Sequence, residues 1–218
     1  ILGGVHMVSQ YEEFRVLGTA RPLDQTNGLA YLGNRWVRQT AFAGQSAYSA
    51  DIRVANMMEK WQRDNIERRD ELVKVLDIDL EWRMHQVSDG QRKRVQIMIA
   101  LLRPFKLVLI DEFLSELDIV VRDRMFAYLR KECRARNGSI IYATHVFDDL
   151  EEWMDNVVYI NDGVCEEKTS MDSFTNGRRL YTAVKEKLVN DREISNKELN
   201  AKLYGAAGGY TNGRMVDL

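Results

Sequence analysis

The chain has 218 residues, of which 45% are hydrophobic and 29% charged, with 31 lysines and arginines against 33 aspartates and glutamates. The resulting net charge of −2 gives no electrostatic case for direct binding to nucleic acid or to an anionic membrane. No apolar run reaches the roughly 18 residues that a transmembrane helix needs, and we identify no secretory signal peptide. The length allows one large domain or two small ones with a substantial core.

The first fifty residues predict short strands separated by turns. Strand-like patches at 13–17 and 29–32 each run into a glycine, and turn formers such as Pro22 and Asn27-Gly28 lie between them. The stretch 40–45 ends in Gln45, which starts a loop. A glutamine there can contact a ligand or can simply be solvated, and the residues alone leave both readings open.

The segment 50–83 has apolar residues at helical spacing. One predicted helix face carries Val54, Met57, Met58 and Trp61, and a second carries Leu72, Val75 and Leu76. The stretch 63–71 between them is charged in both signs, which predicts a solvated surface rather than a binding patch.

A helix with a polar start follows. Ser88 or Asp89 can cap it, and its apolar positions are Val95, Met98, Ile99 and Leu102. The unpaired N–H groups of a helix start attract anions, and Gly90 allows close approach of the backbone to a phosphate. Ser88 and Gln91 can add side-chain contacts, so Ser88, Gly90 and Gln91 are candidate phosphate-binding residues.

The run 107–110 consists of four apolar residues and ends abruptly in Asp111 and Glu112. It predicts a strand buried on both faces of a parallel α/β sheet, and ligands in such sheets lie beyond the carboxyl ends of the strands. One acid at this place can hold Mg²⁺ while the other polarises a water molecule. The alternative is a strand that merely ends in an acidic turn.

The next segments repeat the strand and helix pattern. Positions 121–133 predict a helix ended by Asn137-Gly138, and 140–144 predict a strand that places His145 at its carboxyl end. Cys133 falls on the apolar side of that helix, and neither it nor Cys165 forms a CxxC site, so we expect a reduced, intracellular protein.

The last part of the chain predicts three further features. A strand at 157–160, a turn and a return strand from Val164 form a hairpin, and a helix covers about 179–189. Residues 191–218 include a glycine-rich stretch, and we expect a flexible C-terminal tail there.

Four motifs, in their order and spacing, resemble the C-terminal half of an ATP-binding-cassette (ABC) ATPase. They are Val87-Ser88-Asp89-Gly90-Gln91, the strand ending in Asp111-Glu112, Ser115-Glu116-Leu117-Asp118, and Ala143-Thr144-His145. The resemblance implies an α/β, P-loop NTPase-like sheet core over 1–190, with an inserted helical subdomain at about 46–105. The region 77–165 resembles the soluble single-cassette eukaryotic family, which includes plant family I proteins and a yeast factor associated with the CCR–NOT transcription regulator.

The resemblance also implies ligands, partners and residue roles. The ligands are ATP and Mg²⁺, and the partner is a second cassette in a homodimer. Asp111 would hold the metal, while Glu112 and His145 would act in catalysis. The remaining nucleotide-binding residues would be Ser88, Gly90, Gln91, Asp118 and Gln45. The sequence departs from the family pattern at Val87, Asp89, Phe113 and Glu116.

The phosphate-binding loop GxxxxGK[ST], known as Walker A, does not occur in this sequence. Ile1-Leu2-Gly3-Gly4 resembles the end of the helix that follows this loop in ABC domains. We therefore expect a fragment that lacks the N-terminal strands and Walker A and is inactive alone, the alternative being a family member that never had the loop.

Three functions are compatible with these motifs. The first is a nucleotide-switched ATPase dimer, cytoplasmic or nuclear. The second is a non-catalytic module that a regulatory complex, such as a transcription regulator, recognises. The third is the nucleotide-binding subunit of a membrane transporter, which would need a separate membrane protein.

Overall fold

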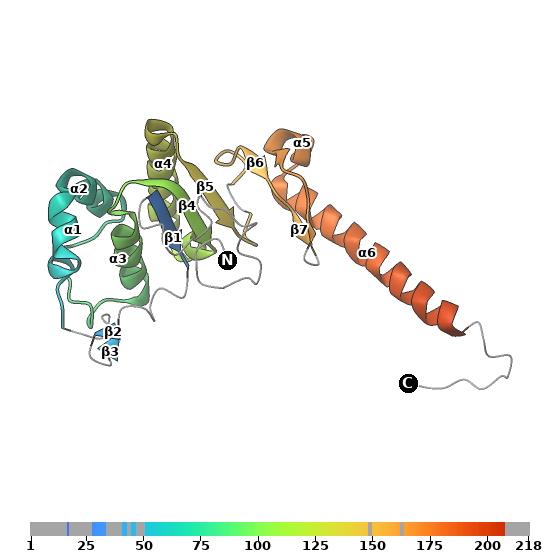
Figure 1. The fold of residues 1–218 in the computed structure, drawn as a ribbon, viewed down its shortest axis with the longest axis horizontal. Helices are drawn as coiled ribbons and strands as arrows, with labels where there is room; N and C mark the ends of the chain where they lie inside the picture. The colour runs from blue at the N-terminus through green and yellow to red at the C-terminus, as the bar shows by residue number, and fades with distance from the viewer. Residues whose placement is uncertain are drawn as a thin grey trace. The chain divides into compact units, whose positions relative to one another are not determined.

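The computed structural model describes residues 17, 28–33, 41–42, 45–46, 51–147, 150–161 and 164–207. They belong to two compact units, Ile1–Val146 and Phe147–Leu218 (Figure 1). The predicted strand at 13–17 lies outside the described residues except for Leu17. In the part of the chain that the structure describes, no helix is both long and apolar enough to cross a membrane.

A parallel three-stranded sheet is the centre of the first unit. Its order is β1-β4-β5, with β1 at Gly28–Leu32, β4 at Phe105–Asp111 and β5 at Ser139–Ala143. Both neighbours of β4 run parallel to it. Its apolar residues are all buried, and only Lys106 and Asp111 are exposed. The predicted buried strand and the α/β fold class are therefore confirmed.

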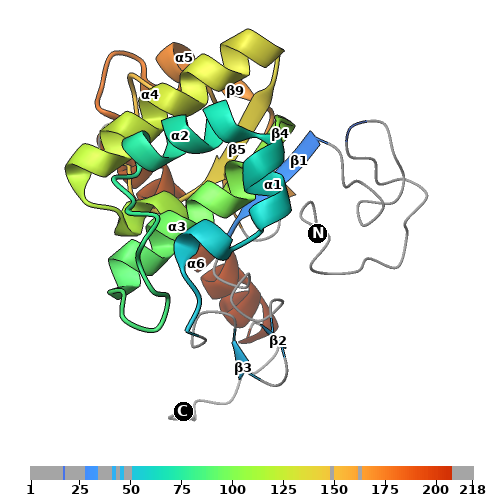
Figure 2. The same ribbon diagram turned by 90° about the vertical axis from the view of Figure 1, so that its left-hand side faces the viewer.

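Helices cover this sheet and connect its strands. α3 (Asp89–Leu101) packs against β1, and α4 (Ile119–Arg136) packs against β4. α1 (Glu59–Asp64) and α2 (Ile66–Val75) lie beyond α3 as seen from the strands in Figure 1. Figure 2 shows α2 between α3 and α4, in line with its contacts to both helices.

The ends of the two long helices follow from local chemistry. Ser88 caps α3, which settles the choice between Ser88 and Asp89, and Asp118 caps α4. Asn137 adopts a left-handed conformation with a φ of 51° and ends α4 where the sequence predicted. Gly138 follows because a Cβ there would lie 3.2 Å from the carbonyl oxygen of Lys106.

The helical pattern expected over 50–83 is only partly correct. A 3₁₀ turn, η4 (Val54–Asn56), precedes α1 and α2, but residues 51–53 and 76–83 are not helical. α2 ends just before Asp77, whose φ of 51° is incompatible with a continuing helix. Arg53 and Arg83 then form an isolated antiparallel bridge, so backbone pairing replaces the helix there.

The strands β2 (Ala41–Phe42) and β3 (Gln45–Ser46) form a separate antiparallel pair. A short 3₁₀ helix, η5 (Phe113–Glu116), connects the end of β4 to α4.

The second unit consists of two short antiparallel pairs and two helices. β6 (Asn156–Val157) pairs with β9 (Thr169–Ser170), and β7 (Ile160–Asn161) pairs with β8 (Val164–Cys165). The predicted hairpin is thus present as β7 and β8, but residues 157–160 do not form one continuous strand. α5 (Met171–Thr175), which was not predicted, precedes the last helix.

The last helix is longer than predicted. α6 covers Leu180–Ala207, so residues 191–207, where a tail was expected, are helical. These positions are mostly good helix formers such as Glu, Lys, Leu and Ala, with one glycine at Gly205. Asp191 is also tied to the strands, because it accepts hydrogen bonds from Tyr159 at 2.8 Å and Asn161 at 3.2 Å. Residues 208–218 lie outside the described part of the chain.

Candidate active site

Two acidic residues leave the central strand at its carboxyl end. Asp111 is the last residue of β4, is paired in register with Ala143 of β5, and is exposed. The Glu112 backbone N–H donates to the Ala143 carbonyl at 2.9 Å, but its φ of 55° and ψ of 5° turn the chain out of the strand. The two carboxylates therefore start from the edge of the sheet where parallel α/β folds bind ligands.

His145 reaches the same edge from the neighbouring strand. It follows β5 by two residues, and its Nδ1 contacts the Oε1 of Glu112. The His145 side chain is 74% exposed and that of Glu112 is 45% exposed, so water has access to both. The structure thus brings together three of the residues singled out from the sequence, while their roles remain predictions.

Asp111 is an exposed carboxylate, a group that can take part in binding Mg²⁺. Among the described residues, no group of three or more His, Cys, Asp and Glu side chains is arranged to hold a metal ion. Mg²⁺ in nucleotide sites commonly takes one or two carboxylates and completes its shell with phosphate oxygens and water. The single exposed carboxylate of Asp111 fits that pattern.

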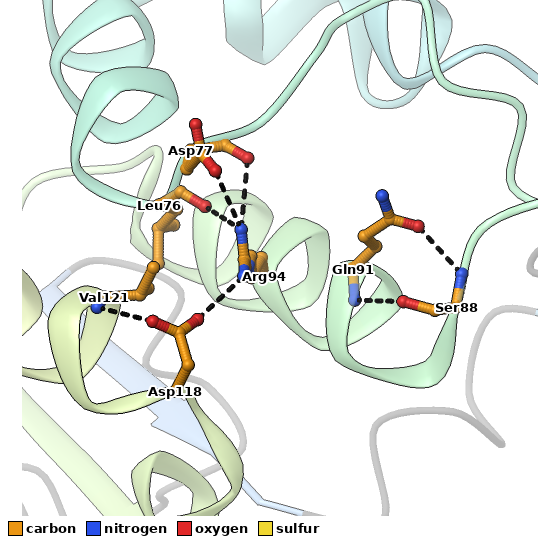
Figure 3. Close-up of polar contacts among 7 residues, drawn as sticks. All are labelled: Leu76, Asp77, Ser88, Gln91, Arg94, Asp118 and Val121. Carbon is orange, nitrogen blue, oxygen red and sulfur yellow. Dashed lines mark hydrogen bonds and ion pairs between the residues drawn. The ribbon is translucent and has the colours of Figure 1, made fainter.

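The start of α3 is a closed capping box. The Ser88 hydroxyl accepts from the Gln91 backbone N–H at 3.2 Å, and the Gln91 side-chain oxygen accepts from the Ser88 backbone N–H at 2.9 Å (Figure 3). Each of the two side chains expected to contact phosphate is thereby bonded to the backbone N–H of the other residue.

Among the described residues, neither steric crowding nor backbone conformation requires glycine at position 90. A Cβ built there meets nothing within 4 Å, and the residue is not in the left-handed region. A helix position with helical φ normally favours alanine over glycine by about 1 kcal/mol. The open space above Gly90 is what close approach of a ligand to the backbone requires.

Asp89, one of the departures from the family pattern, points into solvent. Its side chain is 98% exposed and forms an ion pair with Arg92 at 2.9 Å. The Arg92 guanidinium offsets part of the repulsion that a carboxylate would exert on a nearby phosphate.

Asp118 is engaged within the chain. One carboxylate oxygen accepts from the Val121 backbone N–H at 3.0 Å, and the other pairs with Arg94 at 2.7 Å (Figure 3). The sequence patterns did not predict Arg94, although its place one helical turn after Gln91 puts both on one side of α3. Gln45 lies in β3, and its side chain is outside the described part of the structure.

The sequence patterns also did not predict a buried ion pair of the helices. Arg68 of α2 pairs with Glu132 of α4, each side chain being 9% exposed. Both lie in segments that read as ordinary charged helix surface, so composition carried no signal for their burial.

Comparison with known proteins finds relatives that include plant members of the ABC transporter I family. No family model matches the chain. It is 43% identical over 204 residues, 90% of the chain, to ABC transporter I family member 20 of Arabidopsis thaliana, and 39% identical over 176 residues, 79% of the chain, to member 21. It is 38% identical over 143 residues, 64% of the chain, to CCR4-associated factor 16 of Saccharomyces cerevisiae. The chain spans 62% of the length of each plant relative and 47% of the yeast protein.

The cassette fold is also supported by similarity to solved structures. The ATP-binding subunit of an ABC transporter superimposes with a TM-score of 0.58 at 17% sequence identity, covering 72% of this chain and 67% of that chain. At this identity the similarity establishes the fold alone.

Proposed function

Since the chain is homologous to ATP-binding-cassette proteins and has the fold of their ATP-binding subunits, we propose that it binds and hydrolyses ATP, with Mg²⁺, as part of a cassette dimer. The observation that carries the proposal is the edge of the sheet formed by Asp111, Glu112 and His145. Two carboxylates emerge from the central strand, and the imidazole of the next strand contacts one of them.

Each of these three side chains has a distinct role in the proposal. Asp111 holds Mg²⁺, which supplies positive charge against the phosphate oxygens. Glu112 accepts a proton from the attacking water, and the contact with His145 fixes the direction of its carboxylate. His145 uses Nδ1 for Glu112, so we assign Nε2 to the γ-phosphate.

The start of α3 serves the nucleotide held by the partner copy. Ser88 and Gln91 are held by their capping box, and the N–H groups of the first turn provide a positive end for the phosphate. The open space above Gly90 supports this assignment. Asp118 and Gln45 complete the set of nucleotide-binding residues that we propose.

A second function is favoured by the name of one relative. The yeast protein is called a CCR4-associated factor, which supports a role for this chain as a module that a transcription-regulator complex recognises. In that case nucleotide switches the conformation of the module without rapid turnover.

The test uses the intact protein, with any residues upstream of Ile1 and downstream of Leu218 included. Turnover of ATP is measured with Mg²⁺ for the wild type, for Glu112→Gln, and for Glu67→Gln, an exposed glutamate on α2. Loss of the base should lower kcat by about 10²- to 10⁴-fold in Glu112→Gln and leave Glu67→Gln unchanged.

Two results would contradict the proposal in different ways. Wild-type turnover by Glu112→Gln excludes Glu112 as the base. ATP binding without turnover by the wild type, together with recruitment of a regulatory complex, favours the second function.

A further inference from the structure

Arg94 is bonded to two segments that lie outside its own helix. Its guanidinium pairs with the Asp118 carboxylate at 2.7 Å and with the Asp77 carboxylate at 3.2 Å (Figure 3). The same group donates to the backbone carbonyls of Leu76 at 3.5 Å and Asp77 at 3.4 Å. The side chain is 20% exposed, so these bonds are partly shielded from solvent.

The three segments that Arg94 connects differ in their places in the fold and in the proposed site. Arg94 lies one turn from Gln91, at the end of α3 that we assign to phosphate binding. Asp118 begins α4 and ends the connection from Glu112 through η5. Asp77 follows the end of α2, and its backbone is left-handed with a φ of 51°.

The chemistry of arginine suits a link of this kind. A planar guanidinium has five donors in a rigid fork and can serve two carboxylates and a carbonyl at once. With one oxygen of Asp118 bonded to Arg94 and the other to Val121, the carboxylate has a single defined orientation. The guanidinium therefore connects α3 to the first turn of α4 through this carboxylate.

We infer that Arg94 is a positioning residue that makes the phosphate-binding start of α3 and the Asp118 segment move as one body. This inference rests on the proposed ATPase function for its effect on turnover. In the proposed function, ATP first binds at Asp111, Glu112 and His145 of one copy, and the segments that Arg94 joins act on it when the second copy closes. Loss of Arg94 should therefore lower kcat more than it changes KM.

The experiment compares Arg94→Met with Arg69→Met in the intact protein. Arg69 is a matched control because it also forms a 2.7 Å ion pair, but with its neighbour Asp70 on the same helix. In Arg94→Met, amide hydrogen exchange of residues 119–122 should be roughly fivefold faster, the effect of a weakened helix cap. kcat should fall on the order of tenfold with KM for ATP within about twofold. Arg69→Met should match the wild type in both measurements.

A double variant tests whether the effect passes through Asp118. Asp118→Asn keeps an oxygen for the helix cap but loses the ion pair. Asp118 is also one of the proposed nucleotide-binding residues, so hydrogen exchange at residues 119–122 is measured here in place of kcat. Adding Asp118→Asn to Arg94→Met should make this exchange no faster, because the two changes break the same link.

Three outcomes would overturn the inference. The first is unchanged exchange at residues 119–122, and the second is a kcat equal to that of Arg69→Met in a protein whose wild type turns over ATP. The third is an additive increase in the exchange rate of residues 119–122 in the double variant. If the wild type does not turn over ATP, the ATPase proposal fails, and hydrogen exchange alone decides whether Arg94 links the two segments.

Discussion

Glu112 occupies a backbone conformation that glutamate rarely adopts. Its φ of 55° lies in the left-handed region, which costs a non-glycine residue about 1–3 kcal/mol unless its surroundings enforce it. Here the bond from its N–H to Ala143 and the contact of its side chain with His145 hold it in place. Strain of this kind at an exposed carboxylate beside a histidine is typical of functional sites.

Gly90 provides a prediction in which stability and function change in opposite directions. Gly90→Ala should raise the free energy of unfolding by about 0.5–1 kcal/mol, because alanine favours helix and nothing obstructs its Cβ. The same methyl group should obstruct a phosphate, so ATP turnover should fall. Thermal unfolding and turnover of one preparation check both effects. An alanine variant that gains stability and keeps full turnover would show that no ligand approaches Gly90.

Single residues differ in how well sequence patterns predicted them. Asp111, Glu112 and His145 could be found because a buried strand has a clear apolar signature and its end is a defined place. Arg94 could not, since its partners Asp77 and Asp118 are 17 and 24 residues away along the chain. The left-handed φ of Glu112 has no local signal either, because the residue is neither glycine nor asparagine.

Helices α2, α3 and α4 are fastened together by one buried arginine. Arg68 pairs with Glu132 of α4, donates to the Leu101 carbonyl of α3 at 2.6 Å, and lies over the rings of Phe105 and Tyr128. Burial alone would raise the pKa of Glu132, but its bonds to Arg68 and Arg136 outweigh this and lower it below the ordinary 4.5. Burial also raises the pKa of Tyr128.

The burial of the Arg68–Glu132 pair predicts that replacing Glu132 costs much more stability than replacing the exposed Glu71. Glu132→Gln should lower the free energy of unfolding by about 3–5 kcal/mol, because it leaves the Arg68 charge buried without its partner. Glu71→Gln removes an exposed pair with Lys131 that joins the same two helices, and should cost at most about 1 kcal/mol. Denaturant unfolding of both variants checks the difference. Equal costs would contradict a special role for the buried pair.

The pH dependence of stability follows from the lowered pKa of Glu132. Since the folded pKa lies below the unfolded value of 4.5, the contribution of the pair is complete above that pH. It is lost as the pH falls through the folded pKa. Glu132→Gln should therefore lose less stability than the wild type between neutral pH and the acid range.

The ends of the helices and strands show which boundaries local sequence patterns can predict. β4, β5 and α4 were predicted within about two residues, because apolar periodicity and the Asn137-Gly138 end are local features. The helical prediction over 76–83 was wrong, because pairing between Arg53 and Arg83 is a non-local choice. α6 was predicted too short, because the bonds of Asp191 to Tyr159 and Asn161 reach across the second unit.

The molecule as a whole has two groups of residues that the proposal assigns to one reaction. The acidic edge and His145 come from the ends of β4 and β5, and the capping box begins α3. In the proposal, the first group of one copy and the second group of another meet the same ATP. In this proposal, hydrolysis that depends on Glu112 would end the closed state, because it releases the γ-phosphate that both copies contact.

The most direct test is the mass in solution of intact Glu112→Gln protein, measured by light scattering with ATP and Mg²⁺ and again with ADP and Mg²⁺. A protein that binds ATP but cannot hydrolyse it should have the mass of two chains with ATP and of one chain with ADP, while Glu67→Gln should not accumulate dimer during turnover. A single-chain mass for Glu112→Gln at saturating ATP would contradict a site completed by a second copy.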